Sequence, residues 1–161
     1  MKKNYFDALY LIILGTTIGA VIVLGTIVAP VIFHTNLLYS EELLSHYNEG
    51  VIMSEFFRRF NYLAYVALAA IVVYEGYLFK IFKRDKIAFL SASISAFSIL
   101  LFTEVYTPRI ITLQGLGVEA TMSETFKNLH IASEIDFKIL VVSLAVLFVR
   151  RVVILTTKEK V

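Results

Sequence analysis

The stretch LYLIILGTTIGAVIVLGTIVAPVIF, residues 9–33, contains no charged side chain. A helix needs about 20 apolar residues, each rising about 1.5 Å, to cross the roughly 30 Å of hydrocarbon in a bilayer. The stretch meets that length and is too long for the apolar core of a signal peptide, so it predicts an uncleaved membrane-spanning helix. Three later stretches predict further spans, at residues 60–82, 87–107 and 129–149.

The composition supports an integral membrane protein. The chain has 161 residues, of which 58% are hydrophobic and 17% charged, and its mean hydropathy is +0.78. A soluble domain carries about a quarter charged residues. We therefore predict an all-α, single-domain, four-span bundle over residues 1–161. The absence of cysteine excludes disulfides, thiolate metal sites and thiol catalysis, and a net charge of +2 does not indicate a nucleic-acid partner.

The distribution of lysine and arginine predicts the orientation. Basic residues gather at residues 2–3, 80–86 and 150–160, three segments that fall on one side of a four-span chain. Short loops rich in Lys and Arg stay in the cytoplasm. We expect both termini to be cytoplasmic in a multi-pass protein of the bacterial inner membrane. The lipid bilayer is then the first partner, and the sequence leaves open a homo-oligomer or a partner in a membrane complex.

The outer segments carry helix-boundary signals. Residues 40–57, SEELLSHYNEGVIMSEFF, predict a short interfacial helix that is capped by Ser40 and leads into the second span near Gly50. In the second outer segment, Pro108 is expected to end or kink the third span. Gly115 and Gly117 are expected to form a turn, and Ser123 to cap the fourth span.

Small residues predict close helix contacts. Gly15 and Gly19 lie four residues apart in the first span, and the serines of the third span lie on one stripe: Ser91, Ser95 and Ser98. Small side chains let membrane helices approach closely. These stripes indicate a compact bundle and carry no chemistry.

The stretch NLHIASEIDFKILVV, residues 128–142, combines charge with a membrane span. At about 100° per residue, His130, Glu134 and Lys138 share one helix face with Lys127, whereas Asp136 points the opposite way. Charged groups in a span normally face the bundle or a wet cavity. We therefore predict a polar pocket that opens to the outside and is lined by all four helices. Other residues at the outer ends of the spans are expected to join it: His34, Glu55, Arg58, Arg59, Glu104 and Arg109.

Three hypotheses account for this cluster. In the structural one, the carboxylates of Glu55, Glu104 and Glu134 pair with nearby cations and lock the bundle. The expected cations are Arg58, Arg59, Arg109 and Lys138. The pair of Glu134 with Lys138 has the favourable i,i+4 order.

In the metal hypothesis, the cluster binds an ion. Imidazole with carboxylate suits zinc, and imidazole with thioether suits copper. His130 and Glu134 lie one helical turn apart and can hold one ion together, whereas His46 is expected to be a plain surface residue. The expected ligands are His34, Glu55, Glu104, His130 and Glu134.

The remaining hypotheses are a haem held by His34 and His130, and proton-linked transport through the pocket. Transport has little support, because the inner half of the bundle holds only Glu75, whose single candidate partner is Lys80. No nucleophile elbow, phosphate-binding loop or zinc-protease motif occurs. No catalytic residue is therefore predicted.

Four segments carry a family resemblance: GTIVAPVIF (25–33), FFRRFNYLAYVALAAIVVYE (56–75), TPRI (107–110) and FKNLHIAS (126–133). Together they resemble an uncharacterised four-helix bacterial membrane family of unknown function. That family is similar to the membrane domain of copper-resistance protein D and, more distantly, to the four-helix protoporphyrinogen oxidase of haem synthesis. The residues that match its recurring pattern are Ala29, Pro30, Phe57, Arg59, Pro108 and His130.

The resemblance implies a four-helix architecture, and His130 is the matching residue with chemistry. Copper-resistance relatives imply copper at the outer face. The haem-synthesis relative implies a porphyrin between the helices, but the chain lacks the early histidine in the first span that this activity leads us to expect. The leading hypothesis is thus a protein that binds or handles copper or another divalent ion. A haem protein, an accessory or structural subunit of a membrane complex, and a proton-linked transporter remain alternatives.

Overall fold

The computed structural model describes residues 2–34 and 44–158, and every regular element in these residues is a helix. Four helical runs are long and apolar enough to cross a membrane: Tyr5–Phe33, His46–Lys80, Lys86–Gly115 and Glu124–Thr157. The predicted all-α, four-span fold is confirmed. The third and fourth runs extend beyond both ends of the predicted spans, and the first begins earlier than predicted and ends at the predicted residue. The second run begins earlier, at His46, and ends at Lys80, before the predicted end at residue 82. The elements are α1 (Lys2–Val23), η1 (Leu24–Val28), α2 (Ala29–Phe33), α3 (His46–Lys80), α4 (Lys86–Leu100), η3 (Leu101–Tyr106), α5 (Thr107–Gly115), α6 (Val118–Thr121) and α7 (Glu124–Lys158).

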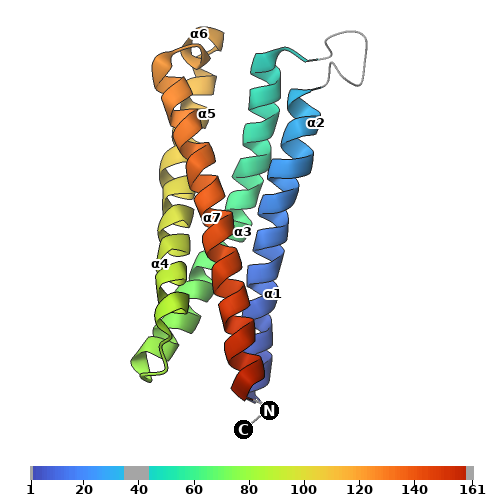
Figure 1. Cartoon of the computed structure of the whole chain (residues 1–161). Helices are drawn as coiled ribbons and strands as arrows, with labels where there is room; N and C mark the ends of the chain where they lie inside the picture. Colours follow the sequence, from blue (N-terminus) through green and yellow to red (C-terminus); the bar gives the residue numbers. More distant parts are fainter. Residues whose placement is uncertain (1, 35–43, 159–161) are drawn as a thin grey trace.

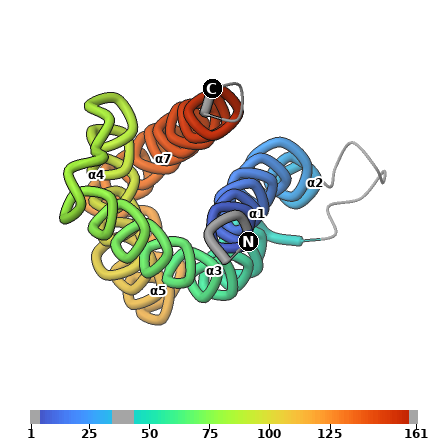
Figure 2. Tube along the Cα trace, turned by 90° about the horizontal axis from the view of Figure 1, so that it is seen from below, coloured from blue at the N-terminus to red at the C-terminus, as the bar shows by residue number. Residues whose placement is uncertain are grey.

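The bundle has two different ends (Figure 1). The start of α1, the turn between α3 and α4, and the end of α7 lie together, and we call this the termini end. The opposite end, which holds α2, α5 and α6, is the distal end. In α7, the half nearer the termini end lies beside α1, whereas the distal half lies beside α5 and stands apart from α2. Seen along the bundle, α1, α3 and α4 follow an arc that α7 crosses obliquely (Figure 2).

Two prolines are built into continuous helical runs. Pro30 and Pro108 lie in the first turns of α2 and α5, and each follows a π-helical segment, η1 or η3. A proline ring clashes with the carbonyl one turn earlier and cannot donate a hydrogen bond, and a local π-helical turn changes the hydrogen-bond pattern there. The third run therefore does not end at Pro108 but continues to Gly115.

Side-chain caps mark the residues at which helices begin. Ser45 caps α3, since its hydroxyl accepts a hydrogen bond from the Asn48 backbone N–H at 3.3 Å. The predicted interfacial helix falls partly on residues 35–43, outside the described residues, as does its expected cap, Ser40. From His46 onward the chain is a single helix that passes Gly50 without a break, so this part is not a separate interfacial helix.

The segment between α5 and α7 contains the turn and the helix cap that were predicted there. The Ser123 hydroxyl accepts a hydrogen bond from the Phe126 N–H at 3.2 Å, which caps α7. Helix α5 ends at Gly115, and Gly117 has a φ of 101°, in the left-handed region that glycine adopts without strain.

The core follows the stripes of small and aliphatic residues. Ser91, Ser95 and Ser98 are buried where α4 packs along α7, and the Ser95 hydroxyl donates a hydrogen bond to the Ser143 hydroxyl at 2.8 Å. At Gly15, an added Cβ would lie 3.6 Å from the Phe148 ring of α7, so this glycine marks a close contact. At Gly19, an added Cβ would meet nothing within 4 Å, so the expected contact there is absent.

Candidate functional site: a cavity at the distal end

The distal end contains a cavity of about 610 Å³, lined mainly by apolar side chains. Its walls come from α1, η1 and α2 on one side, α3 and α5 behind, and α6 and α7 on the other side. The divergence of α7 from α2 towards the distal end leaves this space (Figure 1). The lining residues include Gly25, His46, Met53, Phe57, Phe102, Thr107, Met122, His130, Ser133, Glu134, Phe137 and Lys138.

Aromatic rings form one wall of the cavity. Phe57, Phe102 and Phe137 come from α3, η3 and α7, and their ring centroids lie 5.1–5.3 Å apart. Phe60 packs against Phe102 and Phe137 from the core. Edge-to-face packing of such rings adds to the stabilisation from burial alone, so this wall is a firm junction of three helices.

A charged ladder runs along the α7 wall. His130 Nε2 lies 3.3 Å from Glu134 Oε1, and Lys138 Nζ lies 3.6 Å from Glu134 Oε2. All three residues line the cavity, as the helical spacing predicts. Their side chains are between 43% and 74% exposed, so they are not sealed in the core.

The opposite rim carries a second histidine. His46 at the start of α3 lines the cavity, and its Nδ1 lies 3.2 Å from Glu49 Oε2. Its side chain is 89% exposed, which agrees with the surface position expected for it. Behind the rim, the Tyr47 hydroxyl donates a hydrogen bond to the Gln114 carbonyl at 2.7 Å and ties α3 to α5.

The five expected metal ligands do not converge. Only His130 and Glu134 are among the cavity-lining residues. His34 Nδ1 lies 3.0 Å from the Pro30 carbonyl oxygen, and Glu104 accepts a hydrogen bond from the Tyr65 hydroxyl at 2.6 Å. Within the described residues, no group of three or more His, Asp or Glu side chains is placed to hold a metal ion. The two histidines of the haem hypothesis likewise do not share the cavity.

Several expected ion pairs are present. Glu55 accepts hydrogen bonds from Arg58 at 2.6 and 2.9 Å and from Arg59 at 2.9 Å. Glu134 pairs with Lys138, as described above. Glu104 is bonded to Tyr65 rather than to the expected cation Arg109. The Glu55 pairs are exposed, and exposed pairs stabilise a fold only weakly.

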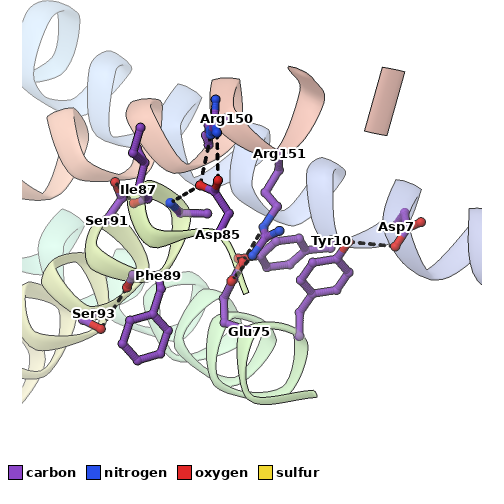
Figure 3. Close-up of polar contacts among 12 residues, drawn as sticks. Asp7, Tyr10, Glu75, Asp85, Ile87, Phe89, Ser91, Ser93, Arg150 and Arg151 are labelled. Carbon is purple, nitrogen blue, oxygen red and sulfur yellow. Dashed lines mark hydrogen bonds and ion pairs between the residues drawn. The ribbon is translucent and has the colours of Figure 1, made fainter. Parts of the chain in front are cut away.

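A buried network at the termini end was not predicted (Figure 3). The Arg151 guanidinium donates to both oxygens of Glu75, with Nε 2.8 Å from Oε1, and the Tyr10 hydroxyl donates to Oε1 at 3.0 Å. Arg151 is 2% exposed and also lies over the Tyr74 ring, whose hydroxyl donates to Asp7 at 2.7 Å. Glu75 thus pairs with Arg151 and Tyr10 instead of Lys80, and the network joins α1, α3 and α7.

Helical phase contained the signal for this network. The charge pattern places Arg151 in the basic segment that follows the fourth span. Its spacing indicates a different position, because it lies 4, 7 and 11 residues after Leu147, Leu144 and Leu140, which are fully buried. This spacing places it on the buried face of α7. The same face therefore continues to the end of the span.

A second pair closes the turn between α3 and α4. The Arg150 guanidinium donates to both oxygens of Asp85, at 3.0 and 2.7 Å, and the Ala88 N–H donates to Asp85 Oδ1 at 3.0 Å (Figure 3). These bonds, that from Arg150 foremost, hold the pKa of the Asp85 carboxyl well below its usual range. Asp85 therefore caps α4 and also fastens it to α7.

Comparison with known protein families agrees with this architecture. Residues 12–119 match the family model described as a domain of unknown function, DUF4149. The chain belongs to this family. No curated protein and no solved structure matches the chain. Membership of an uncharacterised family is thus confirmed, whereas nothing in these matches links the chain to copper-resistance protein D.

The DUF4149 match covers the first three helical runs and ends before α7. It includes the cavity walls from η1, α3 and η3. It also includes Pro30 and Pro108 and the π-helical segments that precede them. The charged ladder on α7 lies outside the matched residues.

Proposed function

We propose that this multi-pass membrane protein binds an amphiphilic, single-chain lipid-like molecule in the distal cavity. The observation that carries the proposal is an apolar cavity of about 610 Å³ with a ladder of charged side chains along one wall. Sites for small molecules have volumes of roughly 300–1,000 Å³ and combine apolar walls with a few polar groups. The chain of the ligand fills the apolar part, and its polar head faces His130, Glu134 and Lys138.

The depth of the cavity supports an amphiphile. On α3, the exposed Arg59 and Lys80 are 21 positions apart, which is about 31 Å of helix and close to the thickness of the hydrocarbon layer. The cavity-lining residues of α3 all precede Arg59, from His46 to Phe57. The lining residues of α1 and α7 reach deeper, to Val21 and Val141, which lie within the candidate membrane spans. The cavity thus extends from the head-group level into the hydrocarbon layer, which suits a molecule with a polar head and an apolar chain.

The distribution of basic residues supports an orientation for this proposal. Lys80, Lys83 and Arg84 are exposed at the termini end, and such residues favour the cytoplasmic side. The cavity then opens on the outer face of the bacterial inner membrane.

Binding of a fluorescent long-chain fatty acid to the chain in nanodiscs tests the proposal. Gly25 lines the cavity, and an added Cβ there would meet nothing within 4 Å, so Gly25→Leu is chosen to occupy part of the cavity. Gly19→Leu is the matched control, since an added Cβ at Gly19 would also meet nothing within 4 Å and Gly19 does not line the cavity. We expect Gly25→Leu to weaken binding about tenfold or more, which is about 1.4 kcal/mol. Equal binding by all three chains would contradict the proposal.

The second candidate is a divalent metal ion held at the distal end. It is favoured by the 3.3 Å separation of His130 Nε2 and Glu134 Oε1, with His46, Met53 and Met122 in the same cavity. Titration of the purified chain with Zn²⁺ and Cu²⁺, beside His130→Ala, tests it. If the ion binds at this place, the wild-type chain should bind Zn²⁺ or Cu²⁺ tightly and His130→Ala should not. If the fatty acid still binds in the presence of a metal chelator, the cavity binds the amphiphile without a metal ion.

A further inference from the structure

Asp136 is a buried carboxylic acid on the face of α7 opposite the charged ladder. The residue is only 6% exposed. The Ser98 hydroxyl of α4 faces its carboxyl group, and the Oδ2 atom of Asp136 is buried without a hydrogen-bond partner among the described residues. The group that faces Asp136 from α4 is thus a neutral hydroxyl group.

The other buried or half-buried carboxylates have stronger partners. Glu75 is bound by Arg151, and Asp85 by Arg150. Asp7 accepts a hydrogen bond from the Tyr74 hydroxyl. Asp136 alone among these combines deep burial with an oxygen that nothing in the described chain satisfies.

Among the described residues, no cation on a neighbouring helix is placed to neutralise Asp136. From α4 the facing group is Ser98, and residues 87–100 contain no ionisable side chain. On η3, Glu104 is exposed and is bonded to Tyr65. The charged groups at this level of α3 and on α7 are exposed and already paired: Arg58 and Arg59 with Glu55, and Lys138 with Glu134.

An ionised carboxylate in such a place is strongly disfavoured, because burial removes its hydration and no opposite charge replaces it. A metal ion would need several further oxygen ligands, whereas a proton needs only the carboxyl group itself. We propose that Asp136 is a proton-binding site that holds its proton at neutral pH.

The site adjoins the cavity. Phe137, the next residue, belongs to the aromatic wall, and Ser133, one turn nearer the distal end, lines the cavity. Loss of the proton would place a charge directly behind this wall and favour an opening that lets water reach it. Binding of a proton at Asp136 therefore stabilises the closed packing of α3, α4 and α7.

Infrared spectroscopy of the purified chain in nanodiscs tests the proposal without any ligand. We expect an absorption band of a protonated carboxylic acid at neutral pH, which Asp136→Asn removes. Glu104→Gln, which alters an exposed carboxyl group, is the matched control and should leave the band. The absence of a band that depends on Asp136 would overturn the proposal.

A second measurement uses the unaltered protein, so its outcome does not depend on whether a variant folds. The chain has three aspartates, Asp7, Asp85 and Asp136, and Asp85 is ionised in its pair with Arg150. Labelling of aspartate side chains with carbon-13 should shift the band in the unaltered protein. A band that does not move would show that no aspartate carries the proton, and would also overturn the proposal.

Discussion

At the scale of single residues, Glu75 and Arg151 form the most deeply buried ion pair among the described residues. Both side chains are almost fully buried, and Tyr10 adds a third contact. Neither charge can be hydrated if its partner is removed. The pair therefore stabilises this arrangement of α1, α3 and α7 over others, even though burial of two charges is itself costly.

Removal of one partner should destabilise the protein strongly. We expect Arg151→Met to lower the free energy of unfolding by about 3–5 kcal/mol, because Glu75 is left buried and unpaired. The double variant Glu75→Leu with Arg151→Met should recover most of this loss. Thermal unfolding in detergent measures both, and an unchanged midpoint for Arg151→Met would show that the pair does not hold the bundle.

The pair between Asp85 and Arg150 predicts a loss of stability in acid. The pKa of Asp85 is lower in the folded chain than its unfolded value of about 3.9. Its contribution is therefore complete above the unfolded pKa and disappears as the pH falls through the folded one. Asp85→Asn keeps a good helix cap but removes the charge. The difference in unfolding midpoint between wild type and variant should narrow in acid. A difference that is constant with pH would contradict this account.

At the scale of the helices, close packing of α4 on α7 depends on serine. Ser95 is fully buried and bonded to Ser143, whereas Ser93 on the same helix is exposed. We expect Ser95→Leu to destabilise the bundle by about 1–3 kcal/mol through overpacking, and Ser93→Leu to have little effect. Unfolding in detergent compares the two. Equal effects would mean that α4 does not pack through this face.

Helical periodicity explains why some elements were predictable. The phase of α7 places His130, Glu134 and Lys138 on one line, and the structure brings them to one cavity wall. Periodicity gives the face of a helix but not the distance between helices. The divergence of α7 from α2, and thus the apolar cavity, could not be predicted from the sequence. Pro108 predicted that the third helical run is interrupted, but not that the run would continue through η3 into α5. The π-helical segment η1 before Pro30 was not predicted.

At the scale of the whole molecule, the four-span bundle follows from the apolar stretches, and its orientation remains a prediction. The chain has no cysteine, so a single introduced cysteine reports on one position. With both termini in the cytoplasm, Ser123→Cys at the distal end should react with a membrane-impermeant maleimide on intact cells. Lys83→Cys at the termini end should react only after lysis. The reverse pattern would show that the cavity opens to the cytoplasm.

The central claim is that the distal cavity holds an amphiphile, and native mass spectrometry of the chain released from membranes tests it most directly. We expect wild type and Gly19→Leu to carry one additional mass of a single-chain lipid-like molecule, and Gly25→Leu to appear without it. A bare mass for all three chains, or the same additional mass on all three, would contradict the claim.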